Sequence, residues 1–290
     1  MDFFTPSLNS LLQAFLEEDF GRGDLTQAAL SGCSSSAYWI TKQHGIFCGG
    51  PFIERLFALL DSSVKTQLLV ADGTPISPGQ RLVQFEGPAI SLVGGERTAL
   101  NLAMRLSGIA TLTASLVNDL AGTDVRLADT RKTTPGLRVL EKYAFRCGGG
   151  LNHRLGLDDA AMLKENHLAC VEGIEAAVLS LRQSLPWPAR IIVEVETPQQ
   201  AEEAVCAGVD GLLLDEFPIE LLKSLVPRLR QLASAENECR KMTPIVLEAS
   251  GIDVMDLRSY AETGIDLIST SAPFTKSPWL DFSMLFEQVG

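Results

Sequence analysis

The sequence predicts an α/β protein in two parts: a mixed α+β unit at the start, then a parallel sheet whose strands alternate with helices. Before residue 123, helical patterns and β-like runs follow one another in mixed order, which is typical of an α+β unit. From residue 123 onward, short apolar runs alternate regularly with helical stretches, as in βαβ units. Nearly all of these runs end on a polar or charged residue.

The first unit is predicted from the spacing of its apolar residues. Leucine and phenylalanine within 8–16 recur at i, i+3, i+4, i+7 and i+8, which predicts an amphipathic helix. A long helical pattern follows Glu96, and we expect Gly108 to interrupt it, so that a second helix covers 111–120. Between these helices we expect a run at 38–48, a helix at 52–60 and β-like runs at 64–70 and 81–85.

The second unit contains six candidate strands, and a seventh could be hidden. Their residues are 125–129, 160–164, 190–196, 211–215, 244–250 and 266–270. Helical patterns lie between them, for example over 171–183, 198–208 and 218–232. This alternation predicts a parallel sheet, in which every strand ends at the same edge.

Composition excludes several classes of protein. The chain of 290 residues has a net charge of −12, whereas a general nucleic-acid binder needs excess positive charge. No window of about 18 consecutive apolar residues occurs, which argues against a membrane span. The amino-terminal end carries acidic residues and lacks the basic region of a secretory signal. We therefore expect a cytoplasmic protein that contacts neither nucleic acid nor membrane.

Six cysteines are scattered along the chain without a C-x-x-C pair. Their wide spacing in a large apolar chain predicts reduced, mostly buried thiols. The three histidines show neither H-x-x-x-H spacing nor partnered cysteines, which argues against a structural zinc site.

Charged residues at the strand ends are the most informative feature. A strand buried on both faces has no packing use for a charge, whereas the carboxyl-terminal rim of a β/α barrel is where catalytic residues lie. The alternative is that each charge merely begins a solvated loop. The residues concerned are Asp129, Lys164, Glu194, Glu196, Asp215, Glu248, Ser250 and Ser269.

A local excess of positive charge predicts an anion site. Residues 126–154 hold seven Lys and Arg against two acidic residues, in an acidic chain. Arg138, Glu141 and Lys142 are at helical spacing and could simply pair with one another. We expect the anion ligands to be Arg131, Lys132, Arg154 and Lys164.

Two acidic strand ends and one histidine complete the predicted site. Glu194 and Asp215 on neighbouring strands are suited to Mg²⁺ held partly by substrate phosphates, or they could only pair with the lysines. His153 follows a glycine triplet and could donate to an anionic substituent, or it could be a satisfied core histidine. Ser250-Gly251 and Ser269-Thr270-Ser271 are candidate phosphate-binding loops.

One long stretch carries a family resemblance. ADTRKTTPGLRVLEKYAFRCGGGLNHRLGLDDAAMLKENH resembles the central signature of quinolinate phosphoribosyltransferases. EEDFGRGDLT, GGERTALNLAMRLSGIAT, VEVE, LLLDEF and EASGI resemble further segments in the family's order, so that the resemblance covers almost the whole chain.

The resemblance implies a fold and a reaction. The fold is an N-terminal α+β sandwich at 1–112, joined by 274–290, followed by an incomplete, seven-stranded α/β barrel at 113–273 that carries the catalytic site. The implied reaction transfers phosphoribose from phosphoribosyl pyrophosphate to quinolinate with loss of CO₂, giving nicotinate mononucleotide and pyrophosphate in de novo NAD synthesis, with Mg²⁺ as cofactor. The implied assembly is a homodimer with shared active sites, or a trimer of such dimers.

The resemblance also implies roles for single residues. Quinolinate would be held by Arg131, Lys132, His153, Arg154 and Lys164. Lys164, Glu194 and Asp215 would be catalytic, with the two acids serving metal and ribose. Arg97 would reach into the neighbouring subunit's site, and Ser250, Gly251 and Ser271 would bind the substrate's phosphate.

Some positions depart from the family pattern, and other functions remain open. Glu216 follows Asp215 where asparagine is common, and the segment Ser269–Ser277 differs from the usual last loop. One alternative is a paralogue of the same fold, such as the proteins associated with molybdenum uptake. Another is a non-catalytic anion-binding or scaffold protein, which would not need these charges.

Overall fold

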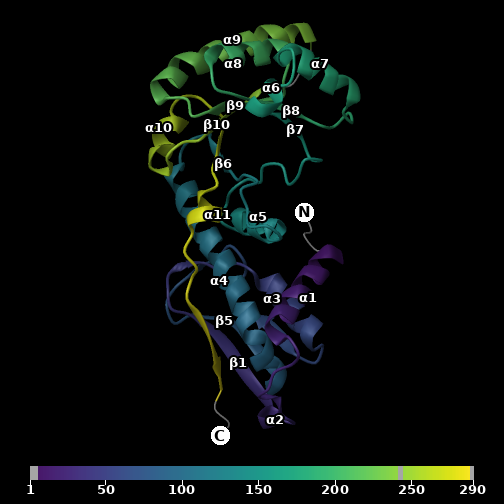
Figure 1. The fold of residues 1–290 in the computed structure, drawn as a ribbon. Helices are drawn as coiled ribbons and strands as arrows, with labels where there is room; N and C mark the ends of the chain where they lie inside the picture. The colour runs from purple at the N-terminus through teal and green to yellow at the C-terminus, as the bar shows by residue number, and fades with distance from the viewer. Residues whose placement is uncertain (1–5, 241–243, 288–290) are drawn as a thin grey trace. The chain divides into compact units, whose positions relative to one another are not determined.

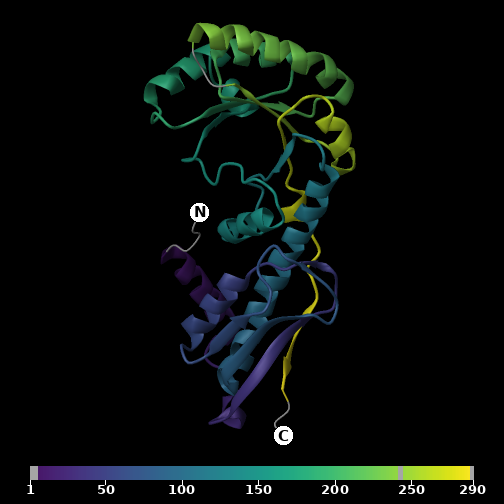
Figure 2. The same ribbon diagram turned by 180° about the vertical axis from the view of Figure 1, so that it is seen from behind.

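The computed structural model describes residues 6–240 and 244–287, which form two compact units (Figures 1 and 2). The first unit comprises residues 1–114, 133–149 and 273–290, and the second comprises 115–132 and 150–272. The expected domain boundary at 112/113 falls inside one long helix, α4 (Ala89–Asp119), which passes from the first unit into the second.

The first unit is built on an antiparallel sheet of four strands in the order β12-β1-β5-β3. The last strand of the chain, β12, pairs with β1 in the register Trp39 opposite Met284. The strands and helices of this unit are α1 (Pro6–Phe20), α2 (Gln27–Leu30), β1 (Ser34–Thr41), β2 (Gly45–Ile46), α3 (Gly50–Leu60), β3 (Lys65–Leu68), β4 (Pro75–Ile76), β5 (Arg81–Pro88), most of α4, α5 (Arg138–Cys147), α11 (Ala272–Lys276, from its second residue) and β12 (Phe282–Phe286).

The core of the first unit lies between this sheet and helices α1, α3 and α4. Side chains alternate along β1, so that Ala37 and Trp39 face the core, as a half-buried strand requires. Trp39 and Phe57 both contact the ring of Phe85, with centroids 5.5 Å and 4.9 Å away. Aromatic rings at such distances add to the stabilisation from apolar burial.

Helix α4 does not break where the sequence analysis expected it to. Gly108 lies inside a continuous helix of 31 residues. A Cβ atom at this position would meet the carbonyl oxygen of Pro278 at 2.1 Å. The glycine therefore permits the returning C-terminal segment to pass close to the helix, and the prediction of two helices was wrong.

By length and composition alone, α4 could cross a membrane, with a mean hydropathy of 1.3 over its most apolar 18-residue window. In the structure 56% of that window is buried within the protein, as in a core helix. The expectation that no such segment exists considered only uninterrupted apolar runs, and it missed this helix.

The second unit contains a six-stranded parallel sheet in the order β6-β11-β10-β9-β8-β7, with helices in between. The predicted alternation of strands and helices is confirmed. Next to β6, Leu151 forms one isolated parallel β-bridge with Ala128. Beyond the six strands, the sheet is continued there only by this bridge among the described residues. The strands and helices of the second unit are the end of α4, β6 (Arg126–Ala128), β7 (Ala161–Leu163), α6 (Glu165–Leu168), α7 (Ile174–Ser184), β8 (Ile191–Val195), α8 (Pro198–Ala207), β9 (Gly211–Asp215), α9 (Ile219–Arg240), β10 (Val246–Ser250), a 3₁₀ turn (Val254–Asp256), α10 (Leu257–Ala261) and β11 (Leu267–Ser269).

The cysteines differ in part from the prediction. Those whose side chains are described are free thiols, as expected. Cys48 is buried and Cys147 half-buried, but Cys33, Cys170 and Cys206 are exposed, so the expectation of mostly buried thiols was wrong. The side chain of Cys239 lies outside the described residues.

Candidate active site

The carboxyl ends of the parallel strands in the second unit bring the predicted charges to one edge. Lys164 directly follows β7, Glu194 is near the end of β8, and Asp215 and Ser250 are the last residues of β9 and β10. Glu194 pairs in register with Leu213, and Asp215 with Ser250. The rim predicted from the strand ends is therefore present in this unit.

Lys164 and Glu194 form a close ion pair. The Lys164 ammonium donates to Glu194 Oε2, and the Glu194 side chain is 10% exposed against 38% for Lys164. Burial raises the pKa of Glu194, while the hydrogen bond and charge of Lys164 act to lower it and the Asp215 charge raises it further. The carboxylate is thus held near a cation in a partly desolvated position, where electrostatic interactions are stronger than in water.

Asp215, Glu216, Ser250 and Gly251 form a tight corner between two strand ends. Ser250 Oγ donates to Asp215 Oδ1, and the Glu216 N–H donates to the Ser250 carbonyl at 3.0 Å. Gly251 has φ +70°, and a Cβ there would meet Glu216 Cγ at 2.5 Å and Asp215 Oδ1 at 3.1 Å. Only glycine fits this close approach without displacing its neighbours.

Arg154 is a buried cation near the Glu194 carboxylate. Its side chain Nη1 donates to the Ala160 carbonyl at 3.0 Å, and the residue is 9% exposed. Burial lowers its pKa, as does the charge of half-buried Arg131, whereas the Glu194 carboxylate raises it. Arg131, Arg154 and Glu194 are therefore close enough to interact, as an anion site with two guanidinium groups requires.

His153 has partners on both ring nitrogens. Nδ1 accepts from the Arg154 N–H at 2.7 Å, and Nε2 lies 3.2 Å from Glu248 Oε2. A neutral ring with Nδ1 accepting donates from Nε2, so this geometry assigns the proton to Nε2. Two roles were open for His153: a donor to an anionic substituent of a ligand, or a histidine whose ring nitrogens are satisfied within the protein. The contacts match the second role more closely.

Buried Asp129 anchors the segment that carries His153 and Arg154. Its carboxylate accepts from the His153 N–H at 2.8 Å and from Asn152 Nδ2 at 2.7 Å, and the residue is fully buried. The charge at the end of β6 thus holds the backbone after the glycine triplet. This strand-end charge orients the neighbouring segment, a role that the sequence analysis did not assign to it.

A cavity of about 360 Å³ enters the second unit at the opposite ends of its strands. His153, Arg154 and Glu248 border it, together with residues at the beginnings of β8, β9 and β10. Lys164, Glu194, Asp215 and Ser250 are not among its lining residues. His153 and Arg154 therefore lie between the cavity and the charged rim.

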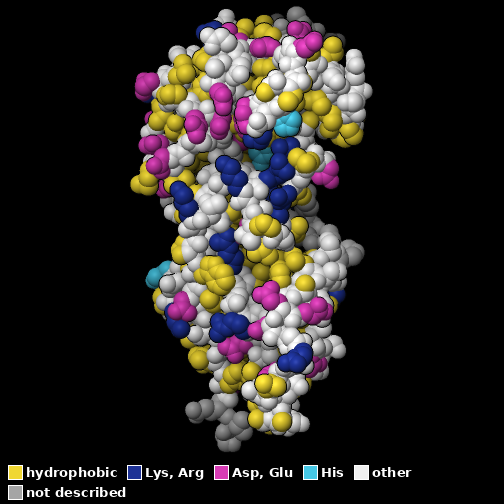
Figure 3. Space-filling view, viewed as in Figure 1, with side chains coloured by type: hydrophobic (Ala, Val, Ile, Leu, Met, Phe, Trp, Pro, Cys, Tyr) yellow, Lys and Arg dark blue, Asp and Glu magenta, His cyan; other side chains and the backbone are white. Residues whose placement is uncertain are grey.

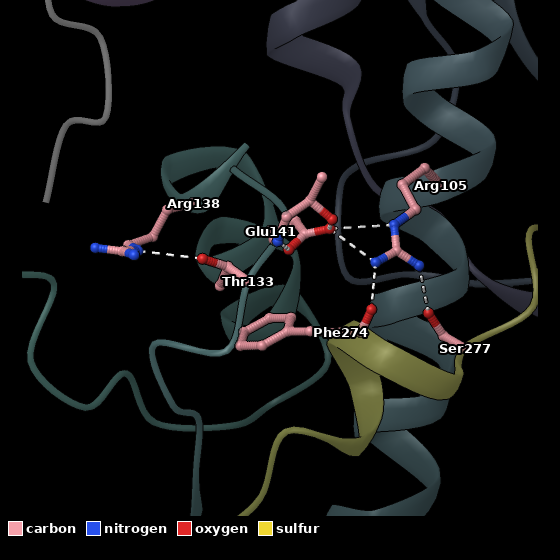
Figure 4. Close-up of polar contacts among 7 residues, drawn as sticks. Arg105, Thr133, Arg138, Glu141, Phe274 and Ser277 are labelled. Atoms are coloured by element: carbon pink, nitrogen blue, oxygen red, sulfur yellow. Dashed lines mark hydrogen bonds and ion pairs between the residues drawn. The ribbon is translucent and has the colours of Figure 1, made fainter. Parts of the chain in front are cut away.

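A second polar network organises the loop that follows Lys132, within the first unit (Figure 4). The fully buried Glu141 accepts from Arg105 Nη2 at 2.7 Å and from the Thr134 N–H at 2.9 Å. Arg105 also donates to the Phe274 carbonyl at 2.5 Å and to Ser277 Oγ at 3.1 Å. Glu141 therefore pairs with Arg105 of α4, a partner outside its own helix.

Three further predicted site residues, Arg97, Lys132 and Ser271, are exposed or half-buried. Arg97 is an exposed residue of α4 in the first unit. Lys132 is exposed, and its N–H donates to Thr130 Oγ1 at 3.0 Å. Ser271 is half-buried between β11 and α11. Figure 3 shows Lys and Arg side chains on the surface of the chain, although its net charge is −12.

The acidic pair suits one type of metal site. Glu194 and Asp215 offer carboxylate oxygens, which are the protein ligands that Mg²⁺ prefers. Among the described residues, the group of three close metal-ligating side chains lies elsewhere, so no third such side chain completes a cage here. The pair therefore fits an ion that takes its other ligands from substrate phosphates and water.

Comparison with protein families decides where this chain belongs. A model of the quinolinate phosphoribosyl transferase N-terminal domain matches residues 24–107, and one of the C-terminal domain of the same family matches residues 109–285. The chain belongs to the quinolinate phosphoribosyl transferase family. The resemblance recognised in the central signature and in the shorter motifs is thereby confirmed.

Relatives of the family cover nearly the whole chain. A probable carboxylating nicotinate-nucleotide pyrophosphorylase of Synechocystis sp. is 44% identical, covering 94% of this chain and 90% of the relative. The human carboxylating nicotinate-nucleotide pyrophosphorylase is 36% identical, covering 96% and 91%. The solved nicotinate-nucleotide pyrophosphorylase of Francisella tularensis has 33% identity and a TM-score of 0.89, with 98% of each chain covered.

The quinolinate phosphoribosyl transferase fold agrees with the predicted class, with one difference in the sheet. The N-terminal antiparallel sheet unit and the C-terminal parallel sheet with helices are as expected. In the described residues the parallel sheet has six strands and a single bridge where seven strands were expected.

Sequence reasoning missed the network of Arg105 and the contact of Glu248 with His153. Arg105 interrupts an apolar helical pattern, and that unpaired charge was the available signal for a buried partner.

Proposed function

We propose that this chain transfers the phosphoribosyl group of phosphoribosyl pyrophosphate to quinolinate with loss of CO₂, forming nicotinate mononucleotide and pyrophosphate for NAD synthesis. Family membership and relatives named as carboxylating nicotinate-nucleotide pyrophosphorylases support the proposal. The observation that carries it is the rim, where the Lys164–Glu194 ion pair lies at the carboxyl ends of parallel strands and the charge of Glu194 acts on the buried Arg154.

The proposed roles follow from charge and position. Arg131, Arg154 and Lys164, with Lys132 beside them, would hold the two carboxylates of quinolinate, because guanidinium and ammonium groups bind such anions directly. His153 would contribute by fixing the Arg154 backbone, through the hydrogen bond from the Arg154 N–H. Ser250, Gly251 and Ser271 would receive the 5′-phosphate at the loops that follow β10 and β11.

Glu194 and Asp215 would act at the ribose. As pyrophosphate leaves, positive charge develops on the sugar, and a carboxylate held nearby stabilises it while the pyridine nitrogen attacks. Ring decarboxylation then follows on the positively charged pyridinium, which accepts the electron pair. Glu194 and Asp215 would hold Mg²⁺, whose charge would neutralise the leaving pyrophosphate.

The proposed assembly is a cytoplasmic homodimer with shared sites, in which Arg97 completes the site of the partner; a trimer of dimers remains the larger alternative. The exposure of Arg97 in α4 leaves its guanidinium accessible for such a contact.

The reaction is tested by incubating the purified protein with quinolinate, phosphoribosyl pyrophosphate and Mg²⁺. We expect nicotinate mononucleotide, pyrophosphate and CO₂ in equal amounts. Nicotinate in place of quinolinate serves as the control, because it lacks the carboxylate that is lost. Calorimetry with quinolinate alone separates binding from turnover. Binding without product would favour the anion-binding protein, and near-native turnover in both Glu194→Ala and Lys164→Ala would contradict the proposed site.

A further inference from the structure

Three metal-ligating side chains from distant parts of the chain converge in the first unit. The sulfur atoms of Cys48 and Cys147 and a carboxylate oxygen of Asp72 all lie within 4.8 Å of one another. Cys48 precedes α3, Asp72 lies in the turn between β3 and β4, and Cys147 ends α5. In the proposed reaction these side chains have no role.

We propose that Cys48, Asp72 and Cys147 bind a thiophilic divalent cation, with Zn²⁺ as the first candidate. Zinc bonds of about 2.3 Å to sulfur and about 2.0 Å to oxygen place tetrahedral ligands about 3.5–3.8 Å apart. The observed separations of up to 4.8 Å therefore require side-chain shifts of about 1 Å at most. Two thiols and one carboxylate are a ligand set that zinc accepts and Mg²⁺ does not favour.

Neighbouring donors already hold the Asp72 carboxylate. Oδ1 accepts from the Gly50 N–H at 2.9 Å, and Oδ2 accepts from the Gly49 N–H at 2.9 Å and from the Tyr143 hydroxyl at 2.8 Å. Carboxylates that ligate metals are commonly oriented by such outer contacts. The Cys48 thiol also hydrogen-bonds to the Asp72 carboxylate, and a cation that displaces the thiol proton would take the place of that contact.

The three side chains of the cluster differ in solvent exposure, and the more exposed ones give a cation access to the site. Cys48 is fully buried, whereas Asp72 and Cys147 are half-buried. The ring of Phe52 packs edge-on against Tyr143, with centroids 4.8 Å apart. A cation would reach the site past Asp72 and Cys147 and keep water as its fourth ligand.

Cation binding would release protons and would connect two helices of the first unit. The cation replaces one proton on each thiol, so two protons are released and no oxidation occurs. The bound ion would tie the end of α5 to the start of α3. This would stabilise the first unit, because a ligand that binds only the folded state shifts the equilibrium toward it.

Cadmium titration of the reduced, metal-free protein tests the proposal. We expect an ultraviolet thiolate-to-cadmium band that saturates at one Cd²⁺ per chain, persists in excess Mg²⁺, and is accompanied by a higher melting temperature. Cys48→Ser and Cys147→Ser should each lose at least half of the band. Cys170→Ser is the matched control, since Cys170 is an exposed cysteine outside the cluster, and it should keep the full band.

Several results would overturn this site. One is the absence of a saturable band in the reduced wild-type protein, which decides the matter even if a variant fails to fold. Another is a band that survives in Cys147→Ser. A third is a redox pair: Cys48 and Cys147 form a disulfide when the protein is treated with peroxide, seen as the loss of two hydrogen masses, while the reduced form binds no Cd²⁺. Because the band is read without substrates, its failure is distinguishable from failure of the proposed reaction.

Discussion

Glu216 adopts a left-handed backbone conformation, with φ 56°, directly after Asp215. It is the one non-glycine residue with positive φ in the part of the chain that the structure describes. This conformation costs most L-residues about 1–2 kcal/mol, whereas asparagine adopts it more readily. The strain lies beside the Ser250–Gly251 corner of the candidate site, where the Glu216 N–H donates to the Ser250 carbonyl and Ser250 Oγ donates to Asp215.

Replacing Glu216 by asparagine should therefore stabilise the protein. We expect Glu216→Asn to increase the free energy of unfolding by about 0.5–1 kcal/mol, measured as a higher urea midpoint at unchanged m-value. Glu172→Asn is the control, because Glu172 is exposed and lacks positive φ, and its effect should stay within about 0.5 kcal/mol. Equal midpoints for Glu216→Asn and wild type would contradict the strain.

Glu194 should set the acid limb of the pH profile. Its pKa is raised by burial, by Asp215 and by Glu165, and is lowered by the hydrogen bond and charge of Lys164. Activity that needs the carboxylate falls as pH decreases through this pKa. Removing Lys164 leaves the raising causes in place, so the acid limb must move to higher pH.

The test is the pH dependence of kcat/KM for nicotinate mononucleotide formation. We expect Lys164→Ala to lower kcat about 10²–10³-fold and to displace the acid limb upward. Lys164→Arg retains the charge and should leave the limb closer to that of the wild-type protein. A limb that moves to lower pH in Lys164→Ala would show that Lys164 does not act on Glu194.

At the scale of elements, Gly108 shows how packing overrides a local preference. Within a helix, alanine is about 1 kcal/mol more favourable than glycine. At this position, however, the added Cβ would lie 2.1 Å from the Pro278 carbonyl oxygen and 3.3 Å from Trp279 Cα. Both neighbours are backbone atoms, which cannot move aside without displacing the segment that leads to β12.

Gly108→Ala should consequently destabilise the protein in spite of the better helix former. We expect a loss of about 1–3 kcal/mol, seen as a lower thermal midpoint. Asn101→Ala, at an exposed position of the same helix, is the control and should be neutral or slightly stabilising. An increase in the midpoint of Gly108→Ala would mean that the C-terminal segment does not pass close to α4.

At the scale of the whole molecule, the proposed shared sites make a prediction about mixed assemblies. If Arg97 serves the partner's site, Arg97→Ala and Lys164→Ala chains are each inactive alone but complement each other. In a statistical mixture, half of the dimers pair one chain of each kind and hold one intact site. Activity should thus recover to about one quarter of the wild-type value in the unseparated mixture, and to about one half in the isolated mixed dimer.

The measurement requires co-expression of the two differently tagged variants and isolation of the mixed dimer. A mixture of Glu194→Ala and Lys164→Ala chains is the matched control, because both changes lie on the same side of the proposed shared site and no intact site can form. The absence of recovery in the test pair would place Arg97 with its own chain's site, whereas recovery in the control would place Glu194 and Lys164 in different sites. A monomeric elution volume would contradict the dimer itself.

The sequence by itself determined the fold class, the family and the charged edge of the parallel sheet. It could do so because apolar periodicity reports burial, and because a charge at the end of a buried strand has no packing role. Lys164, Glu194 and Asp215 were found in this way, since the topology of parallel strands places their ends together.

Only the tertiary structure decided which side chains touch. The contacts that it reveals join residues far apart along the chain. They are Arg105 with Glu141, His153 with Glu248, Gly108 with Pro278, and Cys48 with Asp72 and Cys147. No periodic pattern encodes such contacts, because they depend on how whole elements pack against one another.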